Sequence, residues 1–483
     1  MMVVAALVVA GGLFALQTTG RATACNPPVV GSAGRYQAQK IAFGPVTEYC
    51  LGAPSRWANG VAVGPDGSVW FGEQSLPGLG RLMTNGTVVE YGWPGAQPFE
   101  TGSNNSPRTG IWGVAVWNGK VWGTDSENSL IVGVDPSGGQ LTVLNVTELA
   151  PIPYTFAASP DGSLWFTSLS DPPKVGRIGP DLSLSYFDVL AAEGFEPLQL
   201  EFTNSTAGYL VGLTPSNPGG EQGLYRFNVD PGQMDVRVAK VGGLDLSEPD
   251  SVSSYGRFVW VAQHGPSSIV RYDTDSRTWT VFPLAKPSYT GTTLPYFVEA
   301  QSSQVWFNEH FANRVGMLDP ISGTSVEFSE SDPPPESGSQ VQNDLTIAAT
   351  QEGVWFTSMS GGYVGFVGAG ANGPFSLSVA GGNEVELARG VATSVQVDIA
   401  ASPGSGSWPA QGVIVTDSEN KTSVPRLLSA VSSETSVPAG SGEQVLTVQL
   451  TAASNLPAGR YTVGVTLTDG LIFETVYLFV TVT

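Results

Sequence analysis

The chain has 483 residues, among them 60 Gly and 35 Pro, and only 13% of its side chains are charged. This composition argues against a long helical protein and favours many short strands joined by turns. The formal net charge is −21, from 21 basic and 42 acidic residues, which speaks against nucleic acid as a partner because phosphate binding needs clustered Lys and Arg.

Residues 1–24 are expected to be a signal peptide or an N-terminal hydrophobic segment. Residues 1–16 are apolar but too few to span a membrane comfortably, and Ala22-Thr23-Ala24 has the small side chains of a signal-peptidase site. No Lys or Arg precedes the apolar run, and Arg21 follows it, so a start further upstream or a retained anchor stays open. We expect the protein to be extracellular or at the cell surface.

The chain has only two cysteines, Cys25 and Cys50. In an oxidising compartment we expect them to form a disulfide that pins the new N-terminus to the body of the fold. The alternative is a lipid on Cys25, although a lipobox usually has Leu three positions before the cysteine and Ala22 stands there.

Five Asn-x-Ser/Thr triplets are candidate N-glycosylation sites of an exported protein. A chain rich in Ser and Thr forms such triplets by chance, so each one alone is a weak signal. Together they agree with export. They lie at Asn85, Asn104, Asn145, Asn204 and Asn420.

The stretch "SPDGSLWFTS", Ser159–Ser168, combines a Pro-Asp-Gly turn with a short apolar run suited to a buried strand. Nearly the same letters occur in "GPDGSVWFGE", Gly64–Glu73. Seven copies follow one another at intervals of 43 to 52 residues, which is the length of a propeller blade. They centre on Trp70, Trp122, Trp165, Val211, Trp260, Trp306 and Trp355.

Each copy begins with an apolar strand such as "NGVAV", continues with the Trp strand and a third strand such as "VGRIG", and in several copies ends with a fourth strand such as "TVVEY". The fourth strand is missing after the seventh copy but precedes the first one as "PVTEY", Pro45–Tyr49. A last blade that borrows its outer strand from the N-terminus closes the ring. The sequence therefore predicts an N-terminal extension over residues 25–42 and a seven-bladed β-propeller over residues 43–370, with the tryptophans packed between blades.

These repeats resemble the streptogramin lyase (virginiamycin B lyase) family over about residues 43–367. The resemblance is carried by "WFTS" and "WFGE", by "VGRIG" and "LGRLM" a few residues later, and then by "VTEY" or "VVEY". It implies a seven-bladed propeller. For the true lyases it also implies that a cyclic depsipeptide antibiotic is opened by elimination, with a histidine base and a Mg²⁺ ion held by glutamate.

The catalytic histidines of that family lie in the first strand of a blade, in a Pro-His-small-Ile motif. Elimination needs a base within hydrogen-bond reach of the proton that it abstracts. None of the matching positions in this chain is histidine, so the resemblance supports the fold far more than the reaction. The matching residues are Asn59, Trp112, Tyr154, Leu198, Asp250, Tyr296 and Asp344.

The same positions invite a second interpretation. Aromatic and carboxylate side chains there would ring one mouth of the central channel, as a collar suited to a sugar, a peptide or a cation. Alternatively, Trp and Tyr at these places pack the channel walls, and both interpretations stay open. The candidate ligand-binding residues are Asn59, Trp112, Tyr154, Asp250, Tyr296 and Asp344.

The only histidines, His264 and His310, each follow a Trp strand, at equivalent positions of adjacent copies. Closure of the ring would bring them together, and an acid/base pair or a divalent cation such as Mg²⁺ or Ca²⁺ could result, although no cofactor is certain. His310 with Glu309 is the best catalytic candidate, and the alternative is a pair of solvated loop histidines. The metal candidates are His264, His310, Glu309, Glu73 and Asp125.

After Gly373-Pro374 the propeller repeat motifs no longer occur. Segments with the alternating pattern of β-strands follow, among them "SVQVDI", "VLTVQL" and "FETVYLFVTV". Residues 371–483 are therefore expected to form an immunoglobulin-like β-sandwich. The stretch "LPAGRYTVGVTLTDG", Leu456–Gly470, resembles the penultimate hairpin of many surface-protein modules of this kind.

Two functions are expected from these features. The first is a secreted or cell-surface protein for binding, adhesion or surface assembly, with a surface protein, glycan or peptide as partner and membrane contact only through the N-terminal segment or a Cys25 lipid. The alternative is a lyase-like enzyme that acts on a cyclic depsipeptide or a related ligand at the propeller mouth. Missing family histidines, the second module and the sequons favour the first.

Overall fold

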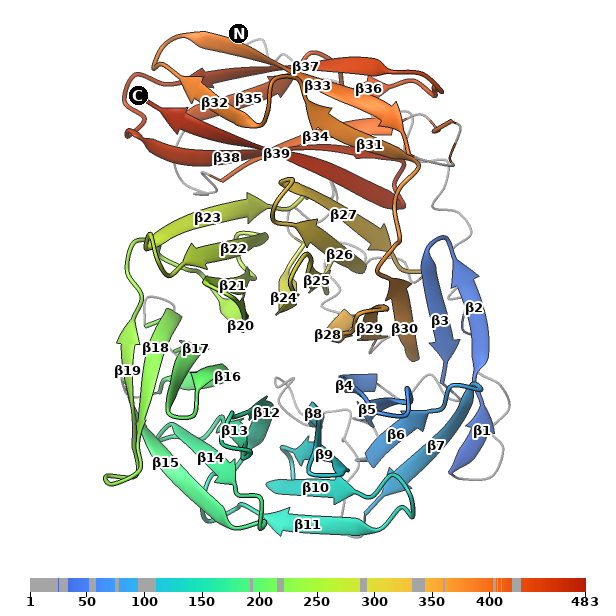
Figure 1. The fold of residues 1–483 in the computed structure, drawn as a ribbon, viewed down its shortest axis with the longest axis vertical. Coiled ribbons are helices and arrows are strands. Elements are labelled where there is room, and N and C mark those ends of the chain that lie inside the picture. Colours follow the sequence, from blue (N-terminus) through green and yellow to red (C-terminus); the bar gives the residue numbers. More distant parts are fainter. Residues whose placement is uncertain are drawn as a thin grey trace, which may run out of the picture.

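The structure is a computed structural model whose described residues are all β or irregular (Figure 1). Among them, no helix is long and apolar enough to cross a membrane. Seven four-stranded blades surround a common axis, and a two-layered unit lies at the rim of the ring (Figure 1). The described residues are 25, 34–51, 58–73, 78–93, 110–191, 194–214, 221–286, 293–331, 344–358, 361–402, 405, 407–409, 411–418 and 427–483.

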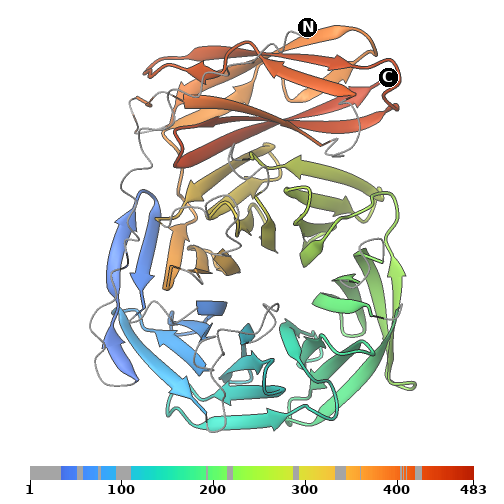
Figure 2. The same ribbon diagram turned by 180° about the vertical axis from the view of Figure 1, so that it is seen from behind.

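The ring is the predicted seven-bladed β-propeller. The innermost strands of neighbouring blades contact one another around the whole ring, including β28 and β4 across the point of closure (Figures 1 and 2). The strands of each blade are given from the axis outward. Blade 1 contains β4 (Ala58–Val63), β5 (Val69–Glu73), β6 (Gly78–Leu82) and β7 (Thr87–Gly92), and blade 2 contains β8 (Ile111–Trp117), β9 (Lys120–Asp125), β10 (Leu130–Val134) and β11 (Leu141–Asn145). Blade 3 contains β12 (Pro153–Ala158), β13 (Leu164–Ser168), β14 (Lys174–Ile178) and β15 (Leu184–Leu190), and blade 4 contains β16 (Glu196–Asn204), β17 (Ala207–Leu213), β18 (Gly223–Asp230) and β19 (Asp235–Lys240). Blade 5 contains β20 (Pro249–Tyr255), β21 (Phe258–Gln263), β22 (Ser268–Asp273) and β23 (Thr278–Pro283), and blade 6 contains β24 (Pro295–Ala300), β25 (Val305–Glu309), β26 (Arg314–Asp319) and β27 (Thr324–Ser329). Blade 7 contains β28 (Asp344–Ala349), β29 (Gly353–Ser358), β30 (Tyr363–Gly368) and, as its outer strand, β3 (Val46–Cys50).

The repeated letters Asp-Gly-Ser-x-Trp form one hydrogen-bonded unit. Asp66 Oδ1 accepts the main-chain N–H and the hydroxyl of Ser68, and the hydroxyl oxygen of Ser68 accepts the indole N–H of Trp70. Arg81 of the third strand pairs with the other oxygen of Asp66. The turn is thus tied to the Trp strand, and the same bonds recur in blade 3 at Asp161, Ser163, Trp165 and Arg177.

Inside a blade, the Phe of the repeated Trp-Phe motif packs on the Gly of the repeated Val-Gly motif. A Cβ atom on Gly176 would lie 1.9 Å from the ring of Phe166, so the phenylalanine of the second strand covers a glycine of the third. Only glycine permits this approach. The same pairing occurs at Gly80 with Phe71, Gly316 with Phe307 and Gly365 with Phe356.

The tryptophans pack between blades, as the repeat predicts. Trp70 shares a buried cluster with Ile111 and Val121 of the next blade, and Trp165 shares one with Phe195 of blade 4. Three of them also meet an aromatic ring of their own fourth strand: Trp70 with Tyr91 at 5.3 Å between ring centroids, Trp165 with Phe187 and Trp260 with Phe282. The blades are therefore held together by apolar burial, the main favourable term in folding.

The ring closes as predicted. Strand β3 pairs antiparallel with β30, from Val46 opposite Val367 to Cys50 opposite Tyr363. Tyr49 lies 5.7 Å from Trp355 between ring centroids, so the borrowed strand also supplies the aromatic partner of the seventh tryptophan. Closure thus copies both the hydrogen bonds and the packing of the other blades.

The expected N-terminal extension adds two further strands to the ring. Strand β2 (Gln39–Phe43) pairs with the outer side of β3, and β1 (Arg35–Gln37) pairs with β7 of blade 1. Successive strands of one short segment therefore cover the outer edges of blades 7 and 1. Together they strap the two blades that meet at the closure.

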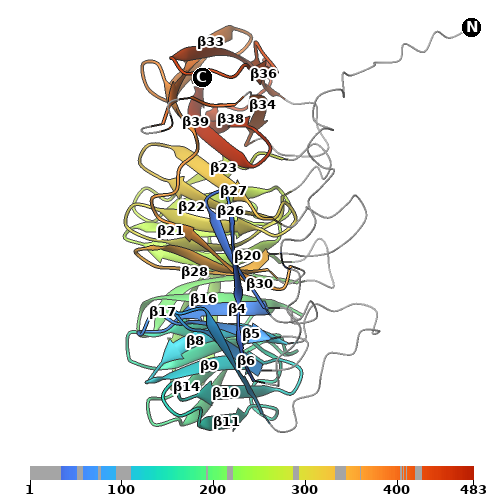
Figure 3. The same ribbon diagram turned by 90° about the vertical axis from the view of Figure 1, so that its right-hand side faces the viewer.

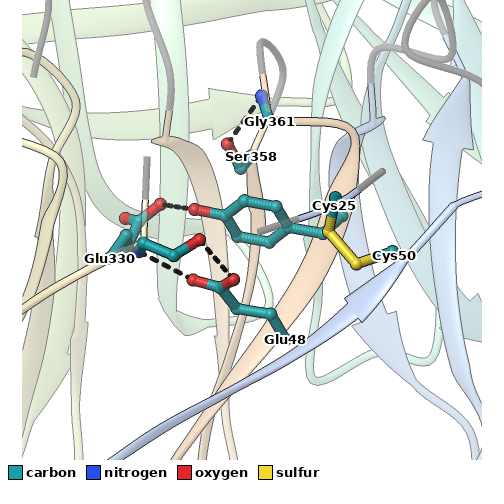
Figure 4. The surroundings of a disulfide bond; sticks show 8 residues. Cys25, Glu48, Cys50, Glu330, Ser358 and Gly361 are labelled. Atoms are coloured by element: carbon teal, nitrogen blue, oxygen red, sulfur yellow. Dashed lines mark hydrogen bonds between the residues drawn. A yellow bond between two sulfur atoms is a disulfide. The ribbon is translucent and has the colours of Figure 1, made fainter. Parts of the chain in front are cut away.

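The predicted disulfide between Cys25 and Cys50 is present, with 5.3 Å between the Cα atoms (Figure 4). Because Cys50 ends β3, the bridge ties the N-terminal segment to the closing strand. The bond also occupies the sulfur that a lipid on Cys25 would need.

Reduction of this disulfide is expected to lower the free energy of unfolding by about 2 kcal/mol, at the low end of the usual range, because pairing with β30 also holds β3 in place. Urea unfolding with and without reductant measures the change, and the double variant Cys25→Ser/Cys50→Ser should match the reduced protein. Thiol labelling of both cysteines in freshly secreted native protein would contradict the bridge.

Two blade edges are covered by other strands of the chain. Strands β15 and β19 pair in parallel, which joins blades 3 and 4 into one sheet. Strand β27 of blade 6 pairs antiparallel with β39 (Ile472–Val482) of the C-terminal unit, from Thr324 opposite Val476 to Phe328 opposite Ile472. The C-terminal unit thus continues a propeller blade, and Figure 3 shows it at the rim of the disc.

The C-terminal unit is a β-sandwich of two sheets. Its buried core contains Trp408, Val397, Leu446 and Leu478, drawn from both sheets. One sheet contains β39, β32 (Glu384–Leu387), β38 (Gly459–Thr468), β34 (Gln411–Asp417) and β36 (Ser436–Val437); the other contains β31 (Phe375–Val379), β33 (Ala392–Ala401), β37 (Gln444–Ala452) and β35 (Leu428–Ser432).

Candidate functional site

The candidate site is the mouth of the channel where the innermost strands begin. In all seven strands the pairing register shifts at this point, beside the residue that matches the histidine position of the lyases. Such a bulge re-aims a side chain and is common beside functional sites. Because every blade has one, the bulge belongs to the repeat, and only the residue identity decides what each blade offers.

Two tyrosines from distant blades meet across the mouth. The hydroxyl groups of Tyr154 in blade 3 and Tyr296 in blade 6 are 2.5 Å apart and form a hydrogen bond. Trp112 packs against Tyr154 with 5.3 Å between ring centroids and a tilt of 50°, and both belong to one buried cluster with Leu198. The predicted aromatic collar therefore comes together, but its rings pack on one another and cross the channel. We call Trp112, Tyr154 and Tyr296 the channel plug.

The two histidines also come together, against the channel plug. Their Nε2 atoms are 2.9 Å apart, and the His310 ring lies 5.0 Å from the Tyr296 ring. His310 is 2% exposed, so these are not solvated loop histidines. On the other side of the pair, His264 Nδ1 lies 3.6 Å from Glu248 Oε2 and 3.7 Å from Asp250 Oδ2.

Burial and neighbouring charges separate the two histidines. Burial lowers the pKa of His264, but Asp250 and Glu248 outweigh it and raise that pKa above its ordinary value. Burial, together with His264, holds the pKa of His310 well below its usual range. These two pKa directions favour His264 as the donor and His310 as the acceptor of the hydrogen bond between their Nε2 atoms.

The carboxyl and phenol groups at the mouth are shifted toward their uncharged forms. Burial raises the pKa of Asp250 to about 7, although His264 opposes the shift. Burial and Tyr154 raise the pKa of Tyr296 well above its ordinary value. Glu248 is the exception, because its interaction with His264 lowers its pKa. At neutral pH, His264 and Glu248 thus favour their charged forms.

The two histidines are expected to titrate far apart. In NMR spectra of the full chain, whose two histidines give two resolvable imidazole signals, one midpoint should lie above 6.5 and the other well below it. Asp250→Asn should lower the upper midpoint, because it removes a carboxylate that favours the imidazolium. His264→Gln assigns the signals. Two midpoints near 6.5 would contradict the buried pair.

Glu309 does not join His310 in a site, which corrects the expected catalytic pairing. Its carboxylate pairs with Arg314 at 2.5 Å, and Glu327 takes the same guanidinium at 2.9 Å. All three side chains are at most 1% exposed. The carboxylate is therefore used inside blade 6, because the strand turns it to the side opposite its neighbour in sequence.

The other metal candidates are not gathered around the histidines. Asp125 accepts hydrogen bonds from the Trp93 indole and from Asn128, and Glu73 is buried in blade 1. Among the described residues, no group of three or more His, Cys, Asp or Glu side chains could hold a metal ion.

The remaining collar residues and the sequons are placed as follows. Asn59 is buried, and its side-chain oxygen accepts the N–H of Gly60. Asp344 begins β28, and its side chain lies outside the description. Asn104, Asn420 and residues 1–24 also lie outside the described residues. Three sequon asparagines are exposed, each accepting the N–H of its own Ser/Thr position, namely Asn85, Asn145 and Asn204.

Sequence reasoning missed two residues of this region. Glu248 faces His264, and its only signal was its place just before the Pro249-Asp250 pair. Arg314 pairs with Glu309, and its signal was a cation at the start of the third strand, a position that Lys174 occupies in blade 3. Both contacts depend on tertiary packing.

Comparison with known proteins agrees with the fold. No family model matches the chain, and no curated protein matches it. A solved streptogramin B lyase has 18% identity and a TM-score of 0.52, over 69% of this chain and 97% of its own. Virginiamycin B lyase from Staphylococcus aureus has 18% identity and a TM-score of 0.52, over 66% of this chain and 98% of its own. At this identity the likeness identifies the ring as a propeller of the streptogramin lyase type in fold.

Proposed function

We propose that this chain is a secreted or cell-surface protein that binds or assembles without catalysis. One observation carries the proposal: the tyrosines of blades 3 and 6 are hydrogen-bonded across the mouth where the lyase chemistry would take place. A substrate at that mouth would have to displace a hydrogen-bonded, mutually packed set of rings. Fold likeness alone does not transfer an activity.

Three further features support the absence of lyase chemistry. None of the seven histidine positions carries histidine. The nearest base, His310, is 2% exposed, while a general base must reach the proton that it abstracts. Glu309, the carboxylate that could have anchored a cation beside it, is paired with Arg314.

The C-terminal sandwich supports a role in display or assembly. We propose that it is an immunoglobulin-like module, and the pairing of β27 with β39 joins blade 6 and one layer of the module into one continuous sheet. Such a body presents its outer faces and rims in a fixed arrangement to a surface protein, a glycan or a peptide. With Cys25 in a disulfide, membrane attachment would fall to the N-terminal segment, and the exposed sequons fit an exported chain.

A lyase-like enzyme is the second candidate, and one observation favours it. The pKa values of His264 and His310 are shifted in opposite directions, as an acid and base pair would require. In this candidate the channel plug opens to admit a cyclic depsipeptide.

The purified chain is therefore expected not to linearise a streptogramin B antibiotic, with or without Mg²⁺. A positioned general base is typically worth about 10² to 10⁴ in rate, and the mouth lacks an accessible one. Mass spectrometry of the antibiotic measures turnover, with virginiamycin B lyase as the positive control. Mg²⁺-dependent linearisation that His310→Ala abolishes would establish the enzyme instead.

A further inference from the structure

Carboxyl groups lie at the boundaries between the structural units of this molecule. We call such a boundary a seam, either between two blades or between the propeller and the sandwich. Burying a carboxylate is costly unless a cation or several hydrogen-bond donors compensate it. Six such groups, buried or largely buried and at or next to a seam, are Glu48, Glu201, Glu299, Glu309, Glu327 and Glu474. Glu330, at the same seam as Glu48, is buried as well.

The closing strand is fastened by one of these groups. Glu48 of β3 is fully buried and accepts the N–H of Ser331 at 2.8 Å and its hydroxyl at 2.5 Å (Figure 4). Beside it, the hydroxyl of Tyr363 donates to Glu330. The N-terminal strand, the end of blade 6 and blade 7 thus meet around two carboxyl groups.

Two more carboxyl groups link innermost strands. Glu201 of blade 4 accepts the N–H of Ser254 in blade 5 at 3.2 Å. Glu299 of blade 6 accepts the N–H of Ala349 in blade 7 at 2.5 Å. The two glutamates also feel each other's charge, since Glu201 contributes to the raised pKa of Glu299.

The seam with the sandwich holds the remaining three. Glu309 and Glu327 share Arg314, whose guanidinium carbon lies 4.1 Å from the ring centroid of Phe473 in β39. Glu474, the next residue of β39, is 8% exposed, and its carboxyl group lies against Gly373 in the segment that leads into the sandwich. Its Oε1 atom is buried without a hydrogen-bond partner.

Positive charge is scarce around these groups. Within the described ranges, Arg314 is the cation paired with any of the six, and it serves two carboxyl groups with one charge. The groups that face the others are the neutral residues Ser331, Ser254, Ala349 and Gly373, and the acidic Glu201 that faces Glu299. A proton is therefore the simplest way to neutralise these sites.

We propose that the molecule is assembled for an acidic medium, in which uncharged carboxyl groups hold its seams together and loss of their protons loosens the seams. This inference stands on the fold and does not depend on the proposed function. It makes the ring closure and the attachment of the sandwich respond to one signal, the external pH.

The directions in which the pKa values of the seam carboxyl groups are shifted agree with this proposal. Burial raises the pKa of Glu299 to about 7 and that of Glu474 to about 8. A group whose pKa is higher in the folded state stabilises the fold below its unfolded value and loses that contribution as the pH rises through the folded value. Stability should therefore fall between about pH 5 and pH 8, the interval set by these two groups.

The test is urea unfolding of the full chain from pH 4.5 to pH 8.5. The wild-type midpoint should fall as the pH rises. Glu474→Gln should raise the midpoint at pH 8 and leave it nearly unchanged at pH 5, because glutamine has almost the same size and shape and does not titrate. For this one group the folding equilibrium constant at pH 8 should improve by roughly 10² to 10³.

Two further variants keep the test decisive. Glu299→Gln should behave like Glu474→Gln at a seam within the ring, and it serves if the first variant does not fold. Glu127→Gln, which replaces an exposed carboxylate, should leave the pH dependence unchanged. A midpoint that is constant or rises from pH 5 to pH 8, or seam variants that match Glu127→Gln, would overturn the proposal.

Discussion

Removal of residues 1–50 is expected to abolish the cooperative unfolding of the propeller. The deletion takes away β1, β2 and β3, the Tyr49 ring that meets Trp355, and Cys50. Blade 7 would then expose the hydrogen-bonding edge of β30, and blades 7 and 1 would lose their strap. An open edge of this kind invites pairing with other chains. Thermal unfolding followed by circular dichroism, together with light scattering, measures the loss.

The matched control removes residues 1–33, which keeps all three strands and removes the disulfide. This shorter deletion should unfold cooperatively, near the reduced full-length protein in stability. If the protein without residues 1–50 also unfolded in one sharp transition, as a monomer, closure by β3 would not be what completes the ring.

Arg314→Met is expected to lower the free energy of unfolding by about 3 to 5 kcal/mol at neutral pH. The variant leaves Glu309 and Glu327 buried without their shared cation, and it removes the donor to the Ala285 carbonyl at 2.7 Å. Burial raises the pKa of both carboxyl groups, with Arg314 opposing, so the loss should shrink at pH 5, where they can protonate. Urea unfolding at both pH values measures it.

Arg237→Met is the matched control, because Arg237 is exposed and pairs with Asp230 and Asp235 at the surface. Exposed pairs are worth about 0 to 1 kcal/mol, so this variant should change little at either pH. A loss for Arg314→Met no larger than for Arg237→Met would mean that the buried cluster does not stabilise the attachment of the sandwich.

The sequence could predict those parts of the fold that depend on residues close together in the chain. Asp66, Ser68 and Trp70 lie within one short turn, and the glycine under Phe166 recurs at a fixed distance along the repeat. Ring closure could be predicted in the same way, because Pro45–Tyr49 carries the motif of the fourth strand. The outer strands β11 and β19 lack that vocabulary, and they were found only in the structure.

The candidate site was predictable in composition but not in arrangement. The repeat placed Trp112, Tyr154 and Tyr296 at one mouth, yet whether they bind a ligand or each other depends on the reach of two side chains across the ring. The role of Glu309 depends on Arg314, because the pairing of β25 with β26 places Arg314 directly opposite Glu309 and the two side chains form an ion pair. Strands β27 and β39 pair although they lie about 150 residues apart, and no local sequence motif indicates this pairing.

The central claim is that the mouth is closed by side chains that pack on one another. A high-resolution crystal structure of the secreted protein, grown with Mg²⁺ present, tests it most directly. We predict that the hydroxyl groups of Tyr154 and Tyr296 are within hydrogen-bond distance, with His310 covered and paired to His264. Separated tyrosines, with a metal ion or an ordered ligand against His264 and His310, would contradict the account.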